Sequence, residues 1–309
     1  MNKPKMTEYK IPISVLMSAF NAEKTIKETI GSVLSQSFRN FEFIIINDGS
    51  EDGTEKVISS FQDDRIRLIN NLGNLGIIDS VNNGLTQCKG KYICRLDADD
   101  ICHKDRLKLQ FRFMEKNPEY VACGTHYRKL INGKATFSSR HYFHVPDEKI
   151  RVLMLRNSPI GNPTSIIRRS VIVENNLKYE PEFEFCEDYA FWFRIMQYGK
   201  LHILNRPLLY YRRHRDQIST KYADIQSANA NIIRETLVRE LVPNISEAEL
   251  ETHLALMADL NSKDNVTCEM VKLWVSKLCR FNTDKKVYDI KEFNKMVAHR
   301  RDKFIESNS

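Results

Sequence analysis

The order of apolar and polar positions in the first third of the chain predicts alternating strands and helices. Apolar runs, several rich in β-branched residues, are typical of strands buried in a sheet. They cover residues 13–20, 41–46, 65–69 and 92–96. Helical spacing of apolar residues follows within residues 26–34, 55–61 and 77–88, and Asn21 is the predicted N-cap of the first of these helices. This alternation predicts β-α-β crossovers and a mostly parallel sheet covered by helices on both faces.

After residue 105 the pattern is less regular. Helices are predicted over residues 106–116, 147–156 and 189–198, and strands over residues 121–131, 164–167 and 201–211. Pro207 is expected to break the last strand, and Asn132-Gly133 predicts a turn. From about residue 222 the patterning is only helical. The predicted organisation is therefore an α/β domain over residues 1–220, in two parts at about 11–105 and 106–220, with a C-terminal helical region over 221–309.

The composition is that of an ordinary globular protein, with 309 residues of which 42% are hydrophobic and 28% charged. No stretch approaches the roughly 20 apolar residues that span a membrane, and the polar N-terminus is not followed by an apolar signal core. We therefore expect a cytoplasmic protein. The seven cysteines form no C-x-x-C pair, which favours free thiols over a zinc site or a disulfide framework.

The formal net charge of +7 suggests an anionic partner. Basic residues cluster at residues 168–169, 212–215 and 299–301. None of these clusters is interleaved with aromatic residues in a nucleic-acid-binding motif. Phosphorylated substrates and an anionic membrane surface are favoured over DNA or RNA.

Chemically active residues follow three of the predicted strands. Phe20-Asn21, residues 47–50 (NDGS) and residues 97–100 (DADD) stand at strand ends, which meet at one edge of a parallel sheet and should converge on one cleft. The last of these places three carboxylates within four residues. Because carboxylates this close repel one another, a divalent cation would stabilise them, and oxygen ligands suit Mg²⁺ or Mn²⁺.

Four motifs together resemble the inverting family 2 glycosyltransferases of the GT-A fold. They are residues 13–21 (ISVLMSAFN), residues 47–50, residues 97–100, and Glu187-Asp188-Tyr189 ahead of Trp192. The resemblance covers about residues 11–219. It implies a nucleotide-sugar half at about 11–105 and an acceptor half at about 106–220.

The resemblance implies a nucleotide site at the first strand ends. Phe20 would stack on the base, Asp48 would accept a hydrogen bond from the imide N–H of uracil, and Asp97 would lie near the ribose. Ser18 and Asn21 belong to the same expected site. An aspartate in this position suits a uridine donor.

The resemblance also implies the catalytic groups. Asp99 would ligate Mn²⁺ or Mg²⁺, and His214 would be a second metal ligand or a diphosphate contact. Asp188 would be the catalytic base, with Glu187 as the next candidate. Inverting transfer is a single displacement that needs one base and one electrophile for the leaving diphosphate. It needs no covalent intermediate with the enzyme.

The expected partners are a nucleotide-sugar donor and a saccharide or lipid-linked saccharide acceptor, in cell-surface polysaccharide or lipopolysaccharide assembly. The helices after residue 222 end in a basic segment, residues 295–303. This segment is typical of peripheral contact with anionic lipid, and a cap on the catalytic domain or a homo-oligomer interface is the alternative.

Other interpretations stay open at this point. The chain could be a non-catalytic nucleotide-sugar-binding scaffold, or a Mg²⁺-dependent phosphatase or nucleotidyltransferase. Asp48 could only shape its turn, Glu187 and Asp188 could be first-turn helix acids, and His214 could be a surface residue. Residues 73–76 (GNLG) lack the lysine of a phosphate loop and are interpreted as a strand-to-helix turn.

Overall fold

A computed structural model describes residues 9–136, 143–213, 222–258 and 265–308. The chain forms two compact units. The first gathers Met1–His144, Ile160–Pro181 and Gln197–Gln217, and the second gathers Val145–Pro159, Glu182–Met196 and Ile218–Ser309. The second unit therefore contains two segments that precede residue 220. These compact units are not the same as domains that fold independently, so the domain boundary predicted at residue 220 stays a prediction.

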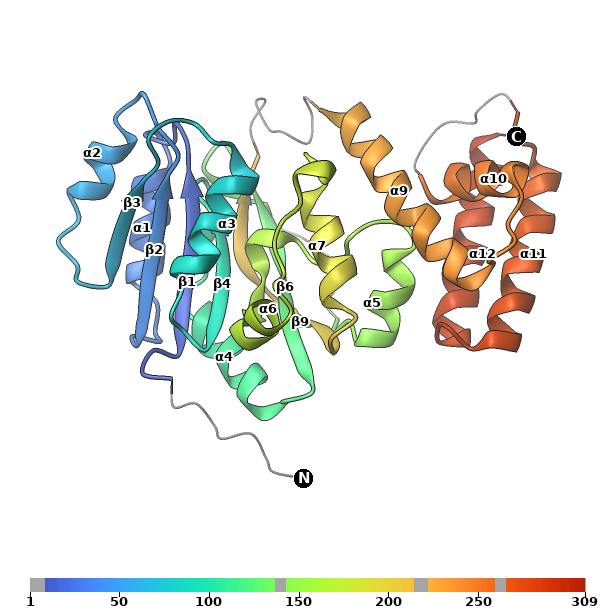
Figure 1. Ribbon diagram of the computed structural model, residues 1–309, viewed down its shortest axis with the longest axis horizontal. Helices are drawn as coiled ribbons and strands as arrows, with labels where there is room; N and C mark the ends of the chain where they lie inside the picture. The colour runs from blue at the N-terminus through green and yellow to red at the C-terminus, as the bar shows by residue number, and fades with distance from the viewer. Residues whose placement is uncertain (1–8, 137–142, 214–221, 259–264, 309) are drawn as a thin grey trace. The chain divides into compact units, whose positions relative to one another are not determined.

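The first unit is built on one sheet, which has nine strands within the described residues (Figure 1). The spatial order is β3-β2-β1-β4-β8-β6-β9-β5, with β7 paired to β6. The strands are β1 (Ile13–Ala19), β2 (Phe41–Asn47), β3 (Ile66–Asn70), β4 (Tyr92–Asp97), β5 (Ile101–Cys102), β6 (Tyr120–Ile131), β7 (Lys134–Ala135), β8 (Ile166–Arg168) and β9 (Lys200–Arg212). The sheet is mixed: β1 to β4 are parallel neighbours, and β6 pairs parallel with β9, whereas β8 and β5 pair antiparallel.

Helices cover the sheet of the first unit. They are α1 (Ile26–Leu34), α2 (Thr54–Ser59), α3 (Ile77–Gln87), α4 (Arg106–Lys116) and α6 (Arg169–Glu174). Val15 and Met17 belong to one core cluster with residues of α1 and α4. On α3, a Cβ added at Gly84 would lie 2.3 Å from Leu16, so this glycine lets α3 pack closely on β1. Successive strand residues are thus buried on opposite faces, which explains why these strands are apolar at nearly every position.

The β6–β9 pair departs from the prediction at Pro207. The prediction that this residue breaks the strand is wrong, because β9 continues through it. The register with β6 shifts on both sides of the proline, and a bulge tolerates the missing N–H. The predicted turn after β6 is confirmed: Asn132 and Gly133 have φ values of 49° and 75° and lead into β7.

Helices make up most of the described residues of the second unit. Its helices are α5 (Asp147–Met154), α7 (Glu187–Ile195), α9 (Ala223–Leu241), α10 (Glu247–Met257), α11 (Cys268–Lys285) and α12 (Ile290–Ser307). The predicted helical region after residue 222 is confirmed. Side-chain caps begin the last three helices, with Ser246, Thr267 and Asp289 each accepting a hydrogen bond from the third residue of the helix. Among the described residues, no helix has both the length and the apolar character needed to cross a membrane.

Candidate functional site at the strand ends

Three strand ends that the sequence singled out lie at one edge of the sheet. β1 stands between β2 and β4 and is parallel to both, with Ser18 opposite Ile46 on one side and Asp97 on the other. Phe20, Asp48 and Asp99 follow the carboxyl ends of these neighbouring strands. The prediction that these ends share one edge is confirmed, and in open α/β sheets this edge is where ligands bind.

The turn after β1 is tied to the turn after β2. The Asn21 backbone N–H donates to Ser50 Oγ (3.1 Å), and Asn21 Oδ1 accepts from the Glu51 N–H (2.9 Å). The prediction that Asn21 is the N-cap of α1 is therefore wrong. Thr25 occupies the N-cap position, and its side chain makes no capping hydrogen bond. The left-handed backbone of Asn21, with φ of 48°, suits an asparagine. The turn leaves Phe20 45% exposed.

The Asp48 carboxylate is buried and organises the loop between β3 and α3. Its Oδ1 accepts from Asn71 Nδ2 (2.8 Å) and from the Leu75 N–H (2.9 Å), and its Oδ2 accepts from the Gly76 N–H (3.0 Å). The predicted strand-to-helix turn at residues 73–76 is confirmed. A carboxylate has about four acceptor positions, so one position on Oδ2 remains for a further donor. Asp48 thus shapes its surroundings, and three of its acceptor positions are used within the first unit.

The acidic turn, Asp97 to Asp100, is fixed by α1 and β9. The hydroxyls of Thr25 and Thr29 donate to the Ala98 carbonyl oxygen at 3.1 and 3.0 Å. From β9, Arg212 Nε donates to the Asp99 carbonyl oxygen (2.7 Å), and the Arg212 backbone N–H donates to Asp100 Oδ1 (2.9 Å). The turn is therefore held by its backbone carbonyls and by Asp100.

The charges of the acidic turn act on one another. Burial raises the pKa of Asp100 well above its usual range, and the negative charges of Asp97 and Asp99 raise it further. Asp100 Oδ2 is buried and has no hydrogen-bond partner among the described residues. Arg95, which is buried within β4, lies 3.7 Å from Asp97 Oδ1 and donates to the Leu16 carbonyl oxygen. Buried Arg95 thus offsets part of the charge of Asp97, and the buried guanidinium of Arg106 lowers the pKa of Asp100 in part.

The donor set of the acidic turn fits a hard divalent cation. Carboxylate oxygens are the preferred ligands of Mg²⁺ and Mn²⁺. Within the described part of the chain, no group of three or more His, Cys, Asp or Glu side chains is arranged to hold a metal. Mg²⁺ commonly uses one or two protein carboxylates, with waters and substrate phosphates completing its coordination. Half-buried Asp99 and the unpartnered Oδ2 of Asp100 are the oxygens of this turn that could serve as those carboxylate ligands.

The predicted catalytic acids belong to the second unit. Glu187 and Asp188 form the first turn of α7, as first-turn acids commonly do. Burial raises the pKa of Asp188, while hydrogen bonds from the backbone N–H of Tyr189 and from its own N–H lower it. A carboxylate with a raised pKa is a stronger base. His214, the other predicted metal ligand, lies outside the described residues.

Two residues that the sequence analysis did not assign contribute to the acidic turn. Arg95 interrupts an apolar strand, and that anomaly was the available signal. Arg212 stood in a basic cluster that was assigned only a general anionic partner. Its bonds to the acidic turn, and its ion pair with Glu28 (2.6 Å) on α1, join segments far apart in the sequence.

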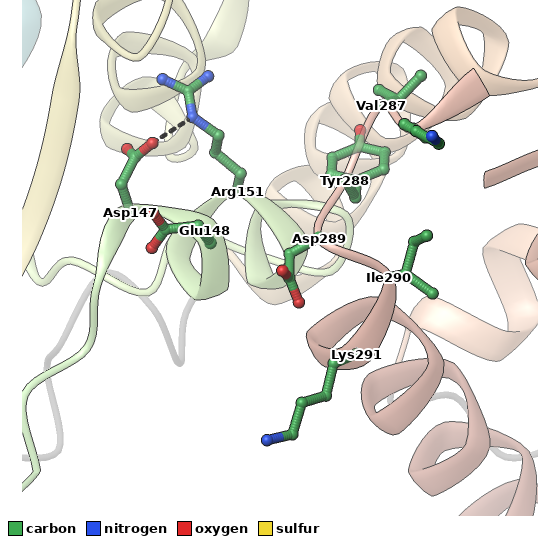
Figure 2. A pocket seen from close by; sticks show the side chains of 9 residues that line it. Asp147, Glu148, Arg151, Val287, Tyr288, Asp289, Ile290 and Lys291 are labelled. Carbon is green, nitrogen blue, oxygen red and sulfur yellow. Dashed lines mark hydrogen bonds and ion pairs between the residues drawn. The ribbon is translucent and has the colours of Figure 1, made fainter. Parts of the chain in front are cut away.

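A separate hollow of about 650 Å³ lies within the second unit (Figure 2). Its walls come from the start of α5 and from residues 286–291, which cover the turn after α11 and the first two residues of α12. Figure 2 shows Asp147 paired with Arg151, at 2.6 Å, beside Glu148 and Asp289. Asp289 also caps α12. Asp147 and Asp289 are thus already engaged, by an ion pair and by a helix cap. We therefore take the strand ends, rather than this hollow, as the candidate functional site.

The sequence matches the family model described as Glycosyl transferase family 2 over residues 14–176. An uncharacterized glycosyltransferase of Haemophilus influenzae is 34% identical over 231 residues, which is 72% of each chain. The Escherichia coli protein WfgD, named a UDP-Glc:alpha-D-GlcNAc-diphosphoundecaprenol beta-1,3-glucosyltransferase, is 30% identical over 62% of this chain and 73% of its own length.

The fold is similar to that of a solved structure. S. aureus TarS 1-349, crystallised in complex with UDP-GlcNAc, superimposes with a TM-score of 0.63 and 19% identity over 96% of this chain and 89% of its own. At this identity the likeness concerns the fold alone. The strand-end motifs, the mixed sheet flanked by helices and the family match agree: the chain belongs to glycosyl transferase family 2 and has the GT-A fold.

Proposed function

We propose that this glycosyltransferase transfers a hexose from a UDP-sugar to a saccharide hydroxyl, with inversion at the anomeric carbon. The observation that carries the proposal is the acidic turn at the carboxyl end of β4. It stands at the same sheet edge as the exposed Phe20 ring and the Asp48 carboxylate. A base-stacking group, an N–H acceptor and oxygen ligands are the parts that a nucleoside diphosphate requires.

Uridine is the proposed base of the donor. Asp48 retains one acceptor position on Oδ2, which matches the single imide N–H of uracil. Two proteins that resemble this chain have names that include uridine donors, UDP-Glc for WfgD and UDP-GlcNAc for the TarS complex. Phe20 offers a ring face on which the base can stack.

The proposed reaction divides the work between two carboxylates. A bond forms between the acceptor oxygen and the anomeric carbon, while the bond from that carbon to the diphosphate oxygen breaks. Asp188 takes the acceptor proton, for which its raised pKa suits it. Asp99 would hold Mg²⁺ or Mn²⁺, which would neutralise charge on the leaving diphosphate. Arg95 and Arg212 keep the acidic turn in position.

The proposed acceptor is a lipid-linked saccharide in polysaccharide assembly. WfgD and WfaP of Escherichia coli are named for transfer to a diphosphoundecaprenol-linked sugar, and TuaG of Bacillus subtilis for teichuronic acid biosynthesis. We further propose that α11 and α12 contact the inner face of the membrane. Leu273 is 64% exposed on α11, and basic side chains accompany it on both helices.

A donor screen tests the proposed function. Melting temperatures are measured with UDP-, GDP- and dTDP-sugars, with and without Mn²⁺, followed by assays of transfer to a lipid-linked saccharide panel. We expect a Mn²⁺-dependent rise for UDP-sugars alone, because selective ligands stabilise by mass action. Preference for guanosine donors would refute the assignment of Asp48. Release of inorganic phosphate without transfer would indicate a phosphatase, and binding without turnover a scaffold.

A further inference from the structure

A second hollow in the first unit is lined by cationic groups and shares no residue with the acidic turn. Its volume is about 300 Å³, and its lining residues are His103, Arg128, Arg206, Pro207, Leu208 and Tyr210. We call it the arginine pocket. It contains two guanidinium groups, an imidazole and a phenol, but no carboxylate. Its composition therefore differs from that of the other strand-end groups.

The bulge in β9 builds the arginine pocket. Opposite β6, Thr125 pairs with Leu204 and His126 with Pro207, so Asn205 and Arg206 are extra residues without partners. Bulges re-aim side chains and are common next to functional sites. β5 completes the wall, since the backbone N–H of His103, just after that strand, donates to the Leu208 carbonyl oxygen at 3.0 Å.

The arginine pocket opens on one face of the β6–β9 pair. Arg128 is opposite Tyr210, and the next pair along the strands is Lys129 with Tyr211. Successive residues of a strand point to opposite faces, so Arg128 and Tyr210 face away from Tyr211. Burial raises the pKa of Tyr211, and the charges of the acidic turn raise it further. Tyr211 and the arginine pocket are thus on opposite faces of the β6–β9 pair.

The guanidinium groups of this pocket lack anionic partners in the described part of the chain. Neither Arg128 nor Arg206 forms an ion pair with a described carboxylate, and Arg128 Nε is buried without a hydrogen-bond partner. Asp105, the acid nearest to His103 in sequence, accepts a hydrogen bond from the Ser37 hydroxyl (2.7 Å). A buried donor without an acceptor is costly, and the planar fork of arginine matches the oxygens of a phosphate.

We propose that the arginine pocket binds a phosphate or diphosphate group through Arg128 and Arg206. His103 is suited to add a third donor. Its Nδ1 accepts from the Asp105 backbone N–H at 3.2 Å, which leaves the proton of a neutral ring on Nε2. The phosphoryl group comes either from a soluble diphosphate or from a lipid headgroup. The proposal extends beyond the transfer reaction and does not depend on Asp99 or Asp188.

Calorimetric titration of the full chain with inorganic diphosphate tests this site. EDTA is present, so that no divalent cation can bridge the diphosphate to Asp99. The Arg128→Met/Arg206→Met double variant should lose at least about tenfold in affinity, since charge-assisted hydrogen bonds are the strong ones. The exposed Arg206→Met alone should lose part of this affinity without loss of melting temperature. Arg112→Met, on the exposed side of α4, removes the same charge elsewhere and should change affinity by less than about twofold.

Three results would overturn the proposal. The first is that the unaltered chain shows no saturable diphosphate binding. The second is that Arg112→Met loses as much diphosphate affinity as the double variant. The third is that Arg206→Met loses Mn²⁺-dependent UDP binding to the same extent as diphosphate binding, which would assign the arginine to the donor site. Co-sedimentation with phosphatidylcholine vesicles, with and without phosphatidic acid, distinguishes the sources. Retention on the anionic vesicles that Arg206→Met abolishes supports a lipid headgroup, and loss of soluble diphosphate binding alone supports a soluble ligand.

Discussion

Gly49 packs against the loop between β3 and α3, whose backbone N–H groups bind the Asp48 carboxylate. Gly49→Ala tests whether this close packing holds the loop in place around Asp48. Gly49 has φ of 67°, and a Cβ there would lie 2.5 Å from the Gly73 carbonyl carbon and 2.7 Å from the Asn74 nitrogen. Both are backbone atoms, so the loop itself must move. Because Leu75 and Gly76 donate their N–H groups to Asp48, this displacement should disturb the proposed uracil acceptor.

The loss of unfolding free energy in Gly49→Ala has two parts, and a second glycine with a similar φ separates them. The left-handed backbone alone costs a residue with a Cβ about 1–2 kcal/mol. Gly133 has a similar φ of 75° but no atom within 4 Å of an added Cβ, so Gly133→Ala should show only this cost. Gly49→Ala should add about 1–3 kcal/mol for steric displacement.

Urea unfolding and UDP calorimetry measure the two effects on the same samples. We expect Gly49→Ala to lose more unfolding free energy than Gly133→Ala, by about 1–3 kcal/mol. Its UDP affinity should fall about fivefold, which is the value of one hydrogen bond of about 1 kcal/mol. Equal unfolding free energies for the two variants, with unchanged UDP affinity for Gly49→Ala, would refute the coupling between the loop and Asp48.

Three further predictions concern other parts of the molecule. Phe20→Ala should weaken binding of uridine and guanosine diphosphates alike by about 1–3 kcal/mol, and a loss confined to one nucleotide in calorimetry would exclude stacking. Asp188→Asn should keep donor binding but lower the transfer rate about 10²–10⁴-fold, whereas near-normal transfer would move the base to Glu187. Burial lowers the pKa of His253 to about 3 from its ordinary 6.5, so the unfolded chain binds the extra proton as pH falls below 6.5. Burial also lowers the pKa of His202, to about 4, so this histidine contributes to the acid sensitivity of both chains. Urea unfolding should therefore show that His253→Gln loses about 3 kcal/mol less than the unaltered chain by pH 4.5, and equal losses would assign the acid sensitivity elsewhere.

The strand-end geometry could be predicted from sequence because it depends on local patterns. Apolar runs set β1, β2 and β4, and the parallel crossover then places their ends at one edge. Pro207 could not be interpreted in this way. The effect of a proline depends on whether the neighbouring strand needs a backbone N–H at that position for a ladder hydrogen bond. The β9 bulge interrupts the regular ladder there, so the missing N–H is tolerated.

The partners of polar side chains were beyond the reach of sequence patterns. Asn21 was assigned to α1 from its position, but its side chain bonds to the turn after β2, about 30 residues away. Arg212 contacts the acidic turn across more than 100 residues of sequence. The arginine pocket likewise depends on a bulge and on strand register, neither of which single-sequence spacing reports.

The central claim is that the acidic turn binds the donor diphosphate through a divalent cation held by Asp99. Calorimetric titration with UDP, with and without Mn²⁺, tests it on Asp99→Asn, with Asp64→Asn as an exposed control that removes the same charge from the same unit. Mn²⁺ should strengthen UDP binding to the unaltered chain and to Asp64→Asn but not to Asp99→Asn, because an amide is a poor ligand for a hard cation. The same strengthening by Mn²⁺ in Asp99→Asn would contradict the account.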